Sequence, residues 1–81
     1  DALERSMISV YPNQAQEKTT IIGMELGTQI QISNSQGSIV FAQTAQSDSI
    51  EVETGKFAAG VYWVRILKSN QQLHMEKLIV Q

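Results

Sequence analysis

Hydrophobic and polar residues alternate with a period of two along most of this chain. Such alternation is typical of β-strands, because successive side chains of a strand lie on opposite faces of the sheet. Seven segments alternate in this way or are rich in β-branched residues: Ile8–Val10, Thr19–Ile22, Ile30–Ile32, Ile39–Phe41, Ile50–Val52, Tyr62–Ile66 and Leu73–Val80. No stretch has a convincing helical period. The pattern predicts seven strands and an all-β fold.

Turn-forming residues separate these segments. Pro12 and Asn13 close the first strand, because proline cannot donate to a sheet and asparagine tolerates turn conformations. The run Asn34–Gly37 predicts a hairpin loop in which Gly37 is free to take a positive φ. Asn70 marks the last hairpin. Short strands at this regular spacing favour a β-sandwich.

Two short segments could form helical turns without changing the fold class. Residues 13–18 are tolerant of helix but are long enough only for a turn or a helical loop. Residues 56–59 could form one helical turn, ended by Gly60.

Length and composition indicate one small domain. The chain has 81 residues, of which 42% are hydrophobic, and it has no cysteine, so disulfides and thiolate metal sites are excluded. No segment approaches the ~20 apolar residues of a membrane span. Residues 1–6 form a polar lead-in that is not a signal peptide, so we expect residues 7–81 to be the domain and the chain to be the tail of a longer, secreted protein.

The charge distribution is uneven. The net charge of −2 argues against nucleic acid as a partner. Residues 1–53 hold seven acids and two bases, whereas residues 54–81 hold one acid and four bases. One explanation is strand pairing, with Glu51 and Glu53 opposite Arg65 or a lysine across the sheet. The other is that the basic C-terminal part faces an acidic receptor.

The sequence gives no support for catalysis. His74 is the only histidine, and nothing in the spacing of Asp48 and Ser49 indicates a triad with it. Glu51 and Glu53 share one strand face and look like solvated residues rather than a glycosidase pair. Acidic residues are scattered rather than clustered as calcium ligands. We therefore predict that the domain is not an enzyme and needs no cofactor or metal.

Trp63 allows two interpretations. Alternation places Trp63 and Arg65 on the face opposite Tyr62, Val64 and Ile66. An outward tryptophan beside an arginine is typical of an interface anchor. Alternatively, Trp63 lies flat against a neighbouring strand, with Arg65 stacked close to it.

The last strand also allows two interpretations. A terminal apolar strand at a sheet edge could be extended by the strand of a partner, or of a second copy in a homodimer. Alternatively, Leu78 and Val80 complete the core. The strand could complete the core and bind a partner's strand at the same time.

Four short motifs, in this order, resemble one known family. They are Val10-Tyr11-Pro12-Asn13, then Ile30-x-Ile32-x-Asn34-x-x-Gly37, then Gly60-Val61-Tyr62-x-Val64-x-Ile66, and finally Lys77-Leu78-Ile79-Val80. Together the motifs resemble the type A C-terminal sorting domain of type IX (Por) secretion cargo in Bacteroidetes, over roughly residues 7–81.

The resemblance implies a fold and a route. The fold would be a seven-stranded, immunoglobulin-like β-sandwich. The cargo, joined to the N-terminal side, would cross the inner membrane and the periplasm, and the domain would then direct it through the outer-membrane translocon with the help of shuttle components. A surface sortase would cut in or before residues 1–6, leaving the cargo at the cell surface or outside the cell.

The resemblance also implies which residues matter. Eight residues would take part in translocon recognition: Gly60, Tyr62, Val64, Ile66, Lys77, Leu78, Ile79 and Val80. Among them, the late strand would supply core and shape, and the last strand would supply the signal proper. Two departures are visible, since Gln14 replaces a frequent second proline and the chain ends in Gln81 where a basic residue is frequent.

A different class of function remains open. An immunoglobulin-like adhesin module, or a protein-binding or dimerisation module, would share the fold, because fold does not decide function.

Overall fold

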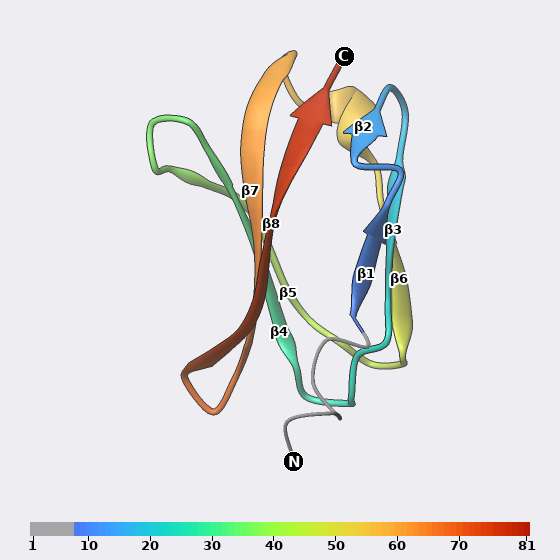
Figure 1. The fold of residues 1–81 in the computed structure, drawn as a ribbon, viewed down its shortest axis with the longest axis vertical. Helices are drawn as coiled ribbons and strands as arrows, with labels where there is room; N and C mark the ends of the chain where they lie inside the picture. The colour runs from blue at the N-terminus through green and yellow to red at the C-terminus, as the bar shows by residue number, and fades with distance from the viewer. Residues whose placement is uncertain (1–7) are drawn as a thin grey trace.

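The computed structural model describes residues 8–81, which form a two-layer β-sandwich (Figure 1). One layer is a three-stranded sheet in the order β1–β3–β6, and the other is a five-stranded sheet in the order β2–β8–β7–β4–β5. The predicted all-β sandwich is confirmed. The expected lead-in over residues 1–6 and the start of the domain at Met7 lie outside the described residues.

All seven predicted strands are present, together with one that was not predicted. The strands are β1 (Ser9–Tyr11), β2 (Gln14–Ala15), β3 (Thr19–Ile22), β4 (Gln29–Asn34), β5 (Ile39–Thr44), β6 (Ser49–Val52), β7 (Gly60–Lys68) and β8 (Gln71–Val80). The prediction of a turn or helical loop over residues 13–18 is wrong, because β2 forms there. A strand of two residues has no hydrophobic period, and it exists through its pairing with β8.

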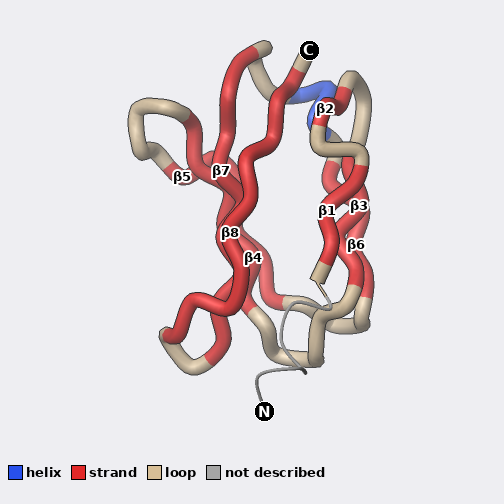
Figure 2. Tube along the Cα trace, in the orientation of Figure 1, coloured by secondary structure: helices blue, strands red, loops and turns tan. Residues whose placement is uncertain are grey.

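One helical turn interrupts the strands, as Figure 2 shows beside the end of β8. This turn, η2, spans Thr54–Lys56, so it begins before the predicted segment 56–59 and ends where that segment starts. No helix within residues 8–81 is long and apolar enough to cross a membrane.

The core lies between the inner faces of the two sheets. Its largest fully buried apolar side chains come from both layers: Ile21, Ile30, Ile32, Val52, Val64, Ile66 and Leu78. Buried residues alternate with more exposed ones from Gln29 to Ser33 on β4 and from Val61 to Leu67 on β7, so the alternation in the sequence corresponds to the inner and outer faces of the sheet. Burial of these aliphatic side chains contributes most of the free energy that stabilises a domain without disulfides.

The predicted hairpin between β4 and β5 is confirmed. Gly37 has a φ of 88°, and its N–H donates to the carbonyl of Asn34 at 3.0 Å. The side-chain oxygen of Asn34 also accepts hydrogen bonds from the backbone N–H groups of Gln36 and Ser38, each at 3.0 Å. Asn34 therefore holds the loop closed, while Gly37 supplies the left-handed conformation that other residues avoid.

The Pro12–Asn13 segment carries the chain from one sheet to the other. β1 lies in the three-stranded sheet and β2 in the five-stranded sheet, and the Tyr11–Pro12 peptide bond between them is cis. The hydroxyl of Thr19 donates to the carbonyl of Pro12 at 2.8 Å. The predicted turn therefore also changes the layer to which the chain belongs.

Candidate functional site

The last hairpin, formed by β7 and β8, is the centre of the five-stranded sheet. The two strands pair antiparallel from Gly60 opposite Val80 to Lys68 opposite Gln71. The register shifts at Ile66/Leu67, where β8 has one extra residue. This hairpin contains every residue that the sequence motifs linked to translocon recognition.

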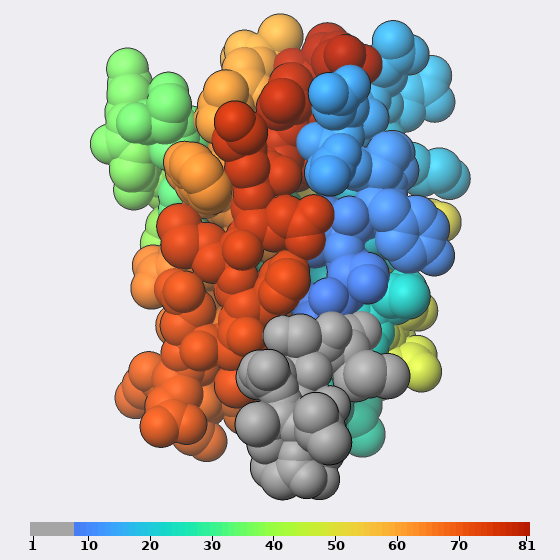
Figure 3. Space-filling model, in the orientation of Figure 1, coloured from blue at the N-terminus to red at the C-terminus, as the bar shows by residue number. Residues whose placement is uncertain are grey.

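The end of β8 has a sheet partner on each side. β7 pairs with one edge of β8, and β2 pairs in parallel with the other edge at Ile79 and Val80. The N–H of Ile79 donates to the carbonyl of Asn13 at 2.9 Å, and the N–H of Gln81 donates to the carbonyl of Ala15 at 2.8 Å. Figure 3 shows the atoms of β8 against those of the β2 region. The end of this strand is therefore enclosed rather than open to a partner's strand.

Five of the eight predicted recognition residues are buried. They are Tyr62, Val64, Ile66, Leu78 and Val80, with at most 6% of each residue exposed. These side chains point into the core and cannot touch a receptor directly. Tyr62 also packs on Phe57, with ring centroids 5.4 Å apart, and its hydroxyl donates to the carbonyl of Ala58 at 2.6 Å.

The other three predicted residues reach the surface. Lys77 and Gly60 are exposed, and Ile79 is partly buried. Gly60 has a φ of 153°, at the limit of the region that favours glycine, and a side chain placed there would meet nothing within 4 Å. Backbone conformation rather than lack of space therefore accounts for this glycine.

The outer face of the five-stranded sheet carries residues that the motif-based prediction did not include. With Lys77 and Ile79, which were predicted, four such residues form what we call the outer strip: Val61, Trp63, Arg65, Met75, Lys77 and Ile79. They form facing pairs across the hairpin, because Val61 lies opposite Ile79, Trp63 opposite Lys77 and Arg65 opposite Met75. The alternation that identified the inward residues also identifies these outward ones.

Trp63 remains substantially exposed within this strip. Its exposed fraction is 37%, and its neighbours across the sheet are Lys77 on β8 and Ser33 on β4. The rest of its surface is covered, so the indole does not project freely. Trp63 therefore has features of both interpretations. It points outward, as an interface anchor would, and it is partly covered by its own sheet.

The prediction that Glu51 or Glu53 faces Arg65 is wrong. Glu51 belongs to β6 in the three-stranded sheet, and its carboxylate lies 3.8 Å from the ammonium of Lys18. Glu53 pairs with Lys56 at 3.0 Å. Arg65 belongs to the other sheet and donates through Nε to the side-chain oxygen of Gln72 at 3.2 Å. A lysine beside the neighbouring strand is therefore found for Glu51 alone, because Glu53 pairs with a lysine three residues along the chain. Arg65 has no carboxylate opposite it in the strand register.

A third ion pair joins the end of β7 to a distant loop. The ammonium of Lys68, at the end of β7, contacts the carboxylate of Glu25 in the loop between β3 and β4. The hydrogen bond from Lys68 and its positive charge lower the pKa of Glu25 below the usual value of 4.5. The carboxylate is fully exposed, so solvent screens this interaction.

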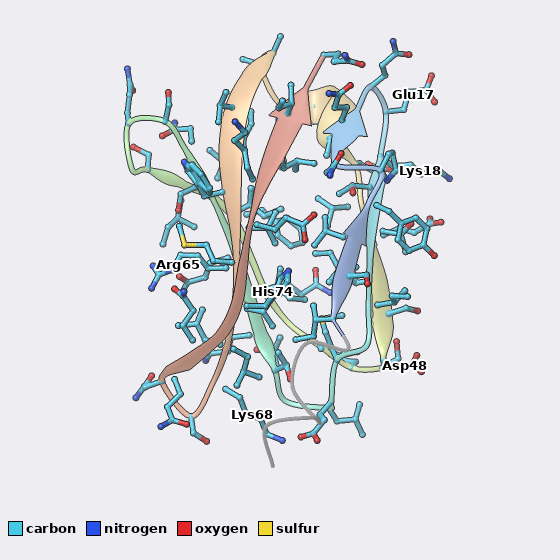
Figure 4. All side chains as sticks on the ribbon, in the orientation of Figure 1. Glu17, Lys18, Asp48, Arg65, Lys68 and His74 are labelled. Atoms are coloured by element: carbon cyan, nitrogen blue, oxygen red, sulfur yellow. The ribbon has the colours of Figure 1, made fainter. Side chains whose placement is uncertain are left out.

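His74 lies on the inner-face side of β8. Figure 4 shows that His74 points toward the three-stranded sheet, whereas Arg65 points away from it. One ring nitrogen of His74 is 2.9 Å from the carboxylate of Glu76. The hydroxyl of Ser49 is in the opposite sheet, so no triad is visible. Within residues 8–81, no group of three or more His, Cys, Asp or Glu side chains could hold a metal ion.

An open groove lies between the edge strands β5 and β6. Its lining includes Phe41, Phe57 and Tyr62, with Glu53 and Lys56 among its charged residues. Glu53 and Lys56 are paired with each other, and Glu51 is a second acidic residue of the lining.

Comparisons with known proteins point to one family. The family model for the secretion system C-terminal sorting domain matches residues 9–81. In a search of solved structures, the chain is similar to PorZ of Porphyromonas gingivalis, described as an essential surface component of the type IX secretion system, with a TM-score of 0.81 and 19% identity. That match covers 93% of this chain but only 11% of the PorZ chain, and it shows the fold. A search of curated proteins finds no match. With its family model matched along nearly all of the described sandwich, the chain belongs to the family of type IX secretion system C-terminal sorting domains.

Proposed function

We propose that this domain directs a cargo protein on its N-terminal side across the outer membrane through the type IX secretion system, and that a surface sortase then removes the domain. The cargo passes through the periplasm and ends at the cell surface or outside the cell. The translocon, its shuttle components and the sortase are the partners of this route. The domain itself performs no chemistry.

The match of the sorting-domain family to residues 9–81 carries this proposal. The sandwich supports it, since the same fold occurs in a component of the type IX system of another bacterium. The described residues also offer surfaces to which a partner protein could bind, as a sorting signal requires. An adhesin or dimerisation module with this fold remains the competing function.

The structure suggests a division of roles within the last hairpin. Tyr62, Val64 and Ile66 are buried and maintain the shape of the sheet, and Leu78 and Val80 do the same from β8. Gly60, Lys77 and Ile79 are the predicted residues that a receptor can reach, together with the outward neighbours of these strands. Pro12, Asn13 and Gly37 act indirectly, by fixing turns.

A reporter fusion tests the proposal. Residues 1–81 are fused to the C-terminus of a periplasm-targeted fluorescent protein and expressed in a type IX-competent bacterium and in a translocon-deficient twin. We expect fluorescence on the surface or in the medium of the competent strain alone. Cleavage by the sortase is followed as loss of the domain from the exported reporter on an immunoblot.

Two controls make the result decisive. A fusion that carries Leu78→Asn, which buries an amide in the core, is expected to lose export because the domain unfolds. A fusion that carries Lys18→Ala, on the opposite sheet, is expected to keep it. Retention of the folded wild-type reporter in the periplasm of both strains would contradict the proposed function and favour a binding module.

A further inference from the structure

We propose that the outer strip of the β7–β8 hairpin is a docking surface for a folded protein partner that presents an acidic surface with apolar residues at its centre. This inference rests on the proposed function, because the partner would belong to the type IX export apparatus. It assigns direct recognition to residues that point outward, in place of the buried residues of the sequence motifs.

The composition of the strip is that of a binding surface. Val61, Trp63 and Met75 have exposed fractions of 38%, 37% and 47%. They lie beside Arg65 and Lys77 on adjacent rows of one sheet face. Tryptophan, methionine and arginine are the residues enriched in protein interfaces, and an apolar centre with polar neighbours is the usual arrangement.

The charge of this face is of one sign. Arg65 and Lys77 are the charged residues of the outer strip, and neither is in an ion pair within the described part of the chain. The acidic residues of the described chain lie elsewhere, in loops, on the three-stranded sheet or on the inner side of β8: Glu17, Glu25, Asp48, Glu51, Glu53 and Glu76. A partner that covers the strip must therefore supply negative charge.

Three other occupants fit this face less well. In a two-fold dimer through the strip, Arg65 and Lys77 of one copy would approach the same cations of the other, which is unfavourable. Nucleic acid would meet only two cations on a chain whose net charge is −2. A bilayer favours several aromatic side chains at the headgroup region, whereas Trp63 is the one aromatic residue of the outer strip.

Charge reversal on the strip tests the inference in the reporter assay described above. The test fusion carries Arg65→Glu with Lys77→Glu. The matched control carries Lys18→Glu with Lys56→Glu, which makes the same change in net charge at exposed sites outside the outer strip. We expect the test fusion to lose export and the control to keep it.

A binding measurement gives the second readout. The purified chain is fluorescently labelled and titrated with outer-membrane preparations from the competent strain and from its translocon-deficient twin. We expect the wild type to bind the competent preparation selectively and less tightly as salt rises, because exposed charges are screened. The double reversal should weaken this binding by roughly tenfold or more, as at an interface hot spot.

A third set of variants separates recognition from folding. Urea unfolding of each purified variant is measured first. If the double reversal unfolds, Lys77→Gln replaces it, since exposed glutamines already occur on β8. Trp63→Ser is compared with Tyr11→Ser, which removes an exposed aromatic residue from the three-stranded sheet. We expect Trp63→Ser to impair binding and Tyr11→Ser to leave it unchanged.

The outcomes are distinguishable. If the wild-type reporter is exported and folded strip variants are exported equally well, this inference is wrong and the proposed function stands. If the wild-type reporter is not exported, the proposed function is wrong, and the inference that rests on it is wrong as well. Equal binding to both membrane preparations, and to phosphatidylglycerol vesicles, would identify a lipid surface as the occupant and overturn the assignment to a protein.

Discussion

At the scale of single residues, Lys77 and Leu78 are sequence neighbours with opposite surroundings. Leu78 is fully buried in the core, whereas the side chain of Lys77 is exposed on the outer face of the sheet. A deletion that removes both cannot tell loss of folding from loss of recognition. Single substitutions can, because the two effects belong to different residues.

We expect Leu78→Ala to reduce the free energy of unfolding by about 2–5 kcal/mol, because it leaves a cavity in a packed core. Lys77→Ala should change it by less than about 0.5 kcal/mol, as is usual for exposed positions. Urea denaturation followed by tryptophan fluorescence measures both values. Equal losses for the two variants would contradict the division between core and surface residues.

The sequence could predict which residues of the last hairpin share a face, but not which face a receptor reads. Period-two alternation separates Tyr62, Val64 and Ile66 from Trp63 and Arg65, and burial confirms this separation. The motifs, however, emphasise the apolar inward residues, because a core imposes the most regular pattern. The recognition role of both sets stays a prediction.

At the scale of elements, the turn between β7 and β8 has a backbone conformation that Asn70 tolerates but Ser69 does not favour. Ser69 and Asn70 both have positive φ, 52° and 65°, in a two-residue loop flanked by the pair Lys68 and Gln71. Positive φ at both positions is typical of a type I′ turn, for which Asn-Gly is the preferred sequence.

We therefore expect Ser69→Asn combined with Asn70→Gly to stabilise the domain by roughly 1 kcal/mol, because a left-handed residue with a Cβ is strained. The urea midpoint measures this change. The control is Ser35→Asn in the β4–β5 loop, where Ser35 does not have a positive φ. A gain of equal size in the control would show that the gain does not come from turn conformation.

Strand positions were easier to predict than strand partners. Each of the seven predicted segments carries its own local signal, either a period of two or a run of β-branched and apolar residues. The position of β2 and the sheet to which Glu51 belongs depend instead on contacts between distant segments, which no local pattern encodes. This is why Gln14–Ala15 was missed and why Arg65 was wrongly placed opposite an acid.

The pair formed by Glu25 and Lys68 connects two elements and makes a pH-dependent contribution. The pKa of Glu25 is lowered in the folded state, chiefly by the hydrogen bond from Lys68 and then by its charge. The stabilisation is therefore present above the usual value of 4.5 and is lost as the pH falls through the lowered pKa.

We expect Glu25→Gln to be slightly less stable than the wild type near neutral pH and at low salt. The two proteins should converge in acid, because the wild-type carboxylate is then also neutral. Urea midpoints measured across the acid range check this, and high salt should narrow the difference. A constant difference at every pH would show that the ion pair is not its cause.

At the scale of the whole molecule, the two sheets have different surfaces. The outer strip carries Arg65 and Lys77 on the five-stranded sheet, whereas Glu51 lies on the three-stranded sheet. Glu51 is paired with Lys18, whereas Arg65 and Lys77 have no ion-pair partner within residues 8–81, so the positive charge of the outer strip is not balanced locally. A partner that approaches this molecule meets a different electrostatic field on each side.

The parallel pairing of β2 with β8 has a mechanical consequence. Because the two strands run in the same direction, a pull on Gln81 against the chain that leads into Asn13 slides one strand along the other. The hydrogen bonds from Ile79 to Asn13 and from Gln81 to Ala15 then bear the load together rather than one after another. This pair of strands is therefore loaded in shear. The carboxyl end of β8 can bear tension without its hydrogen bonds to the β2 segment breaking one at a time.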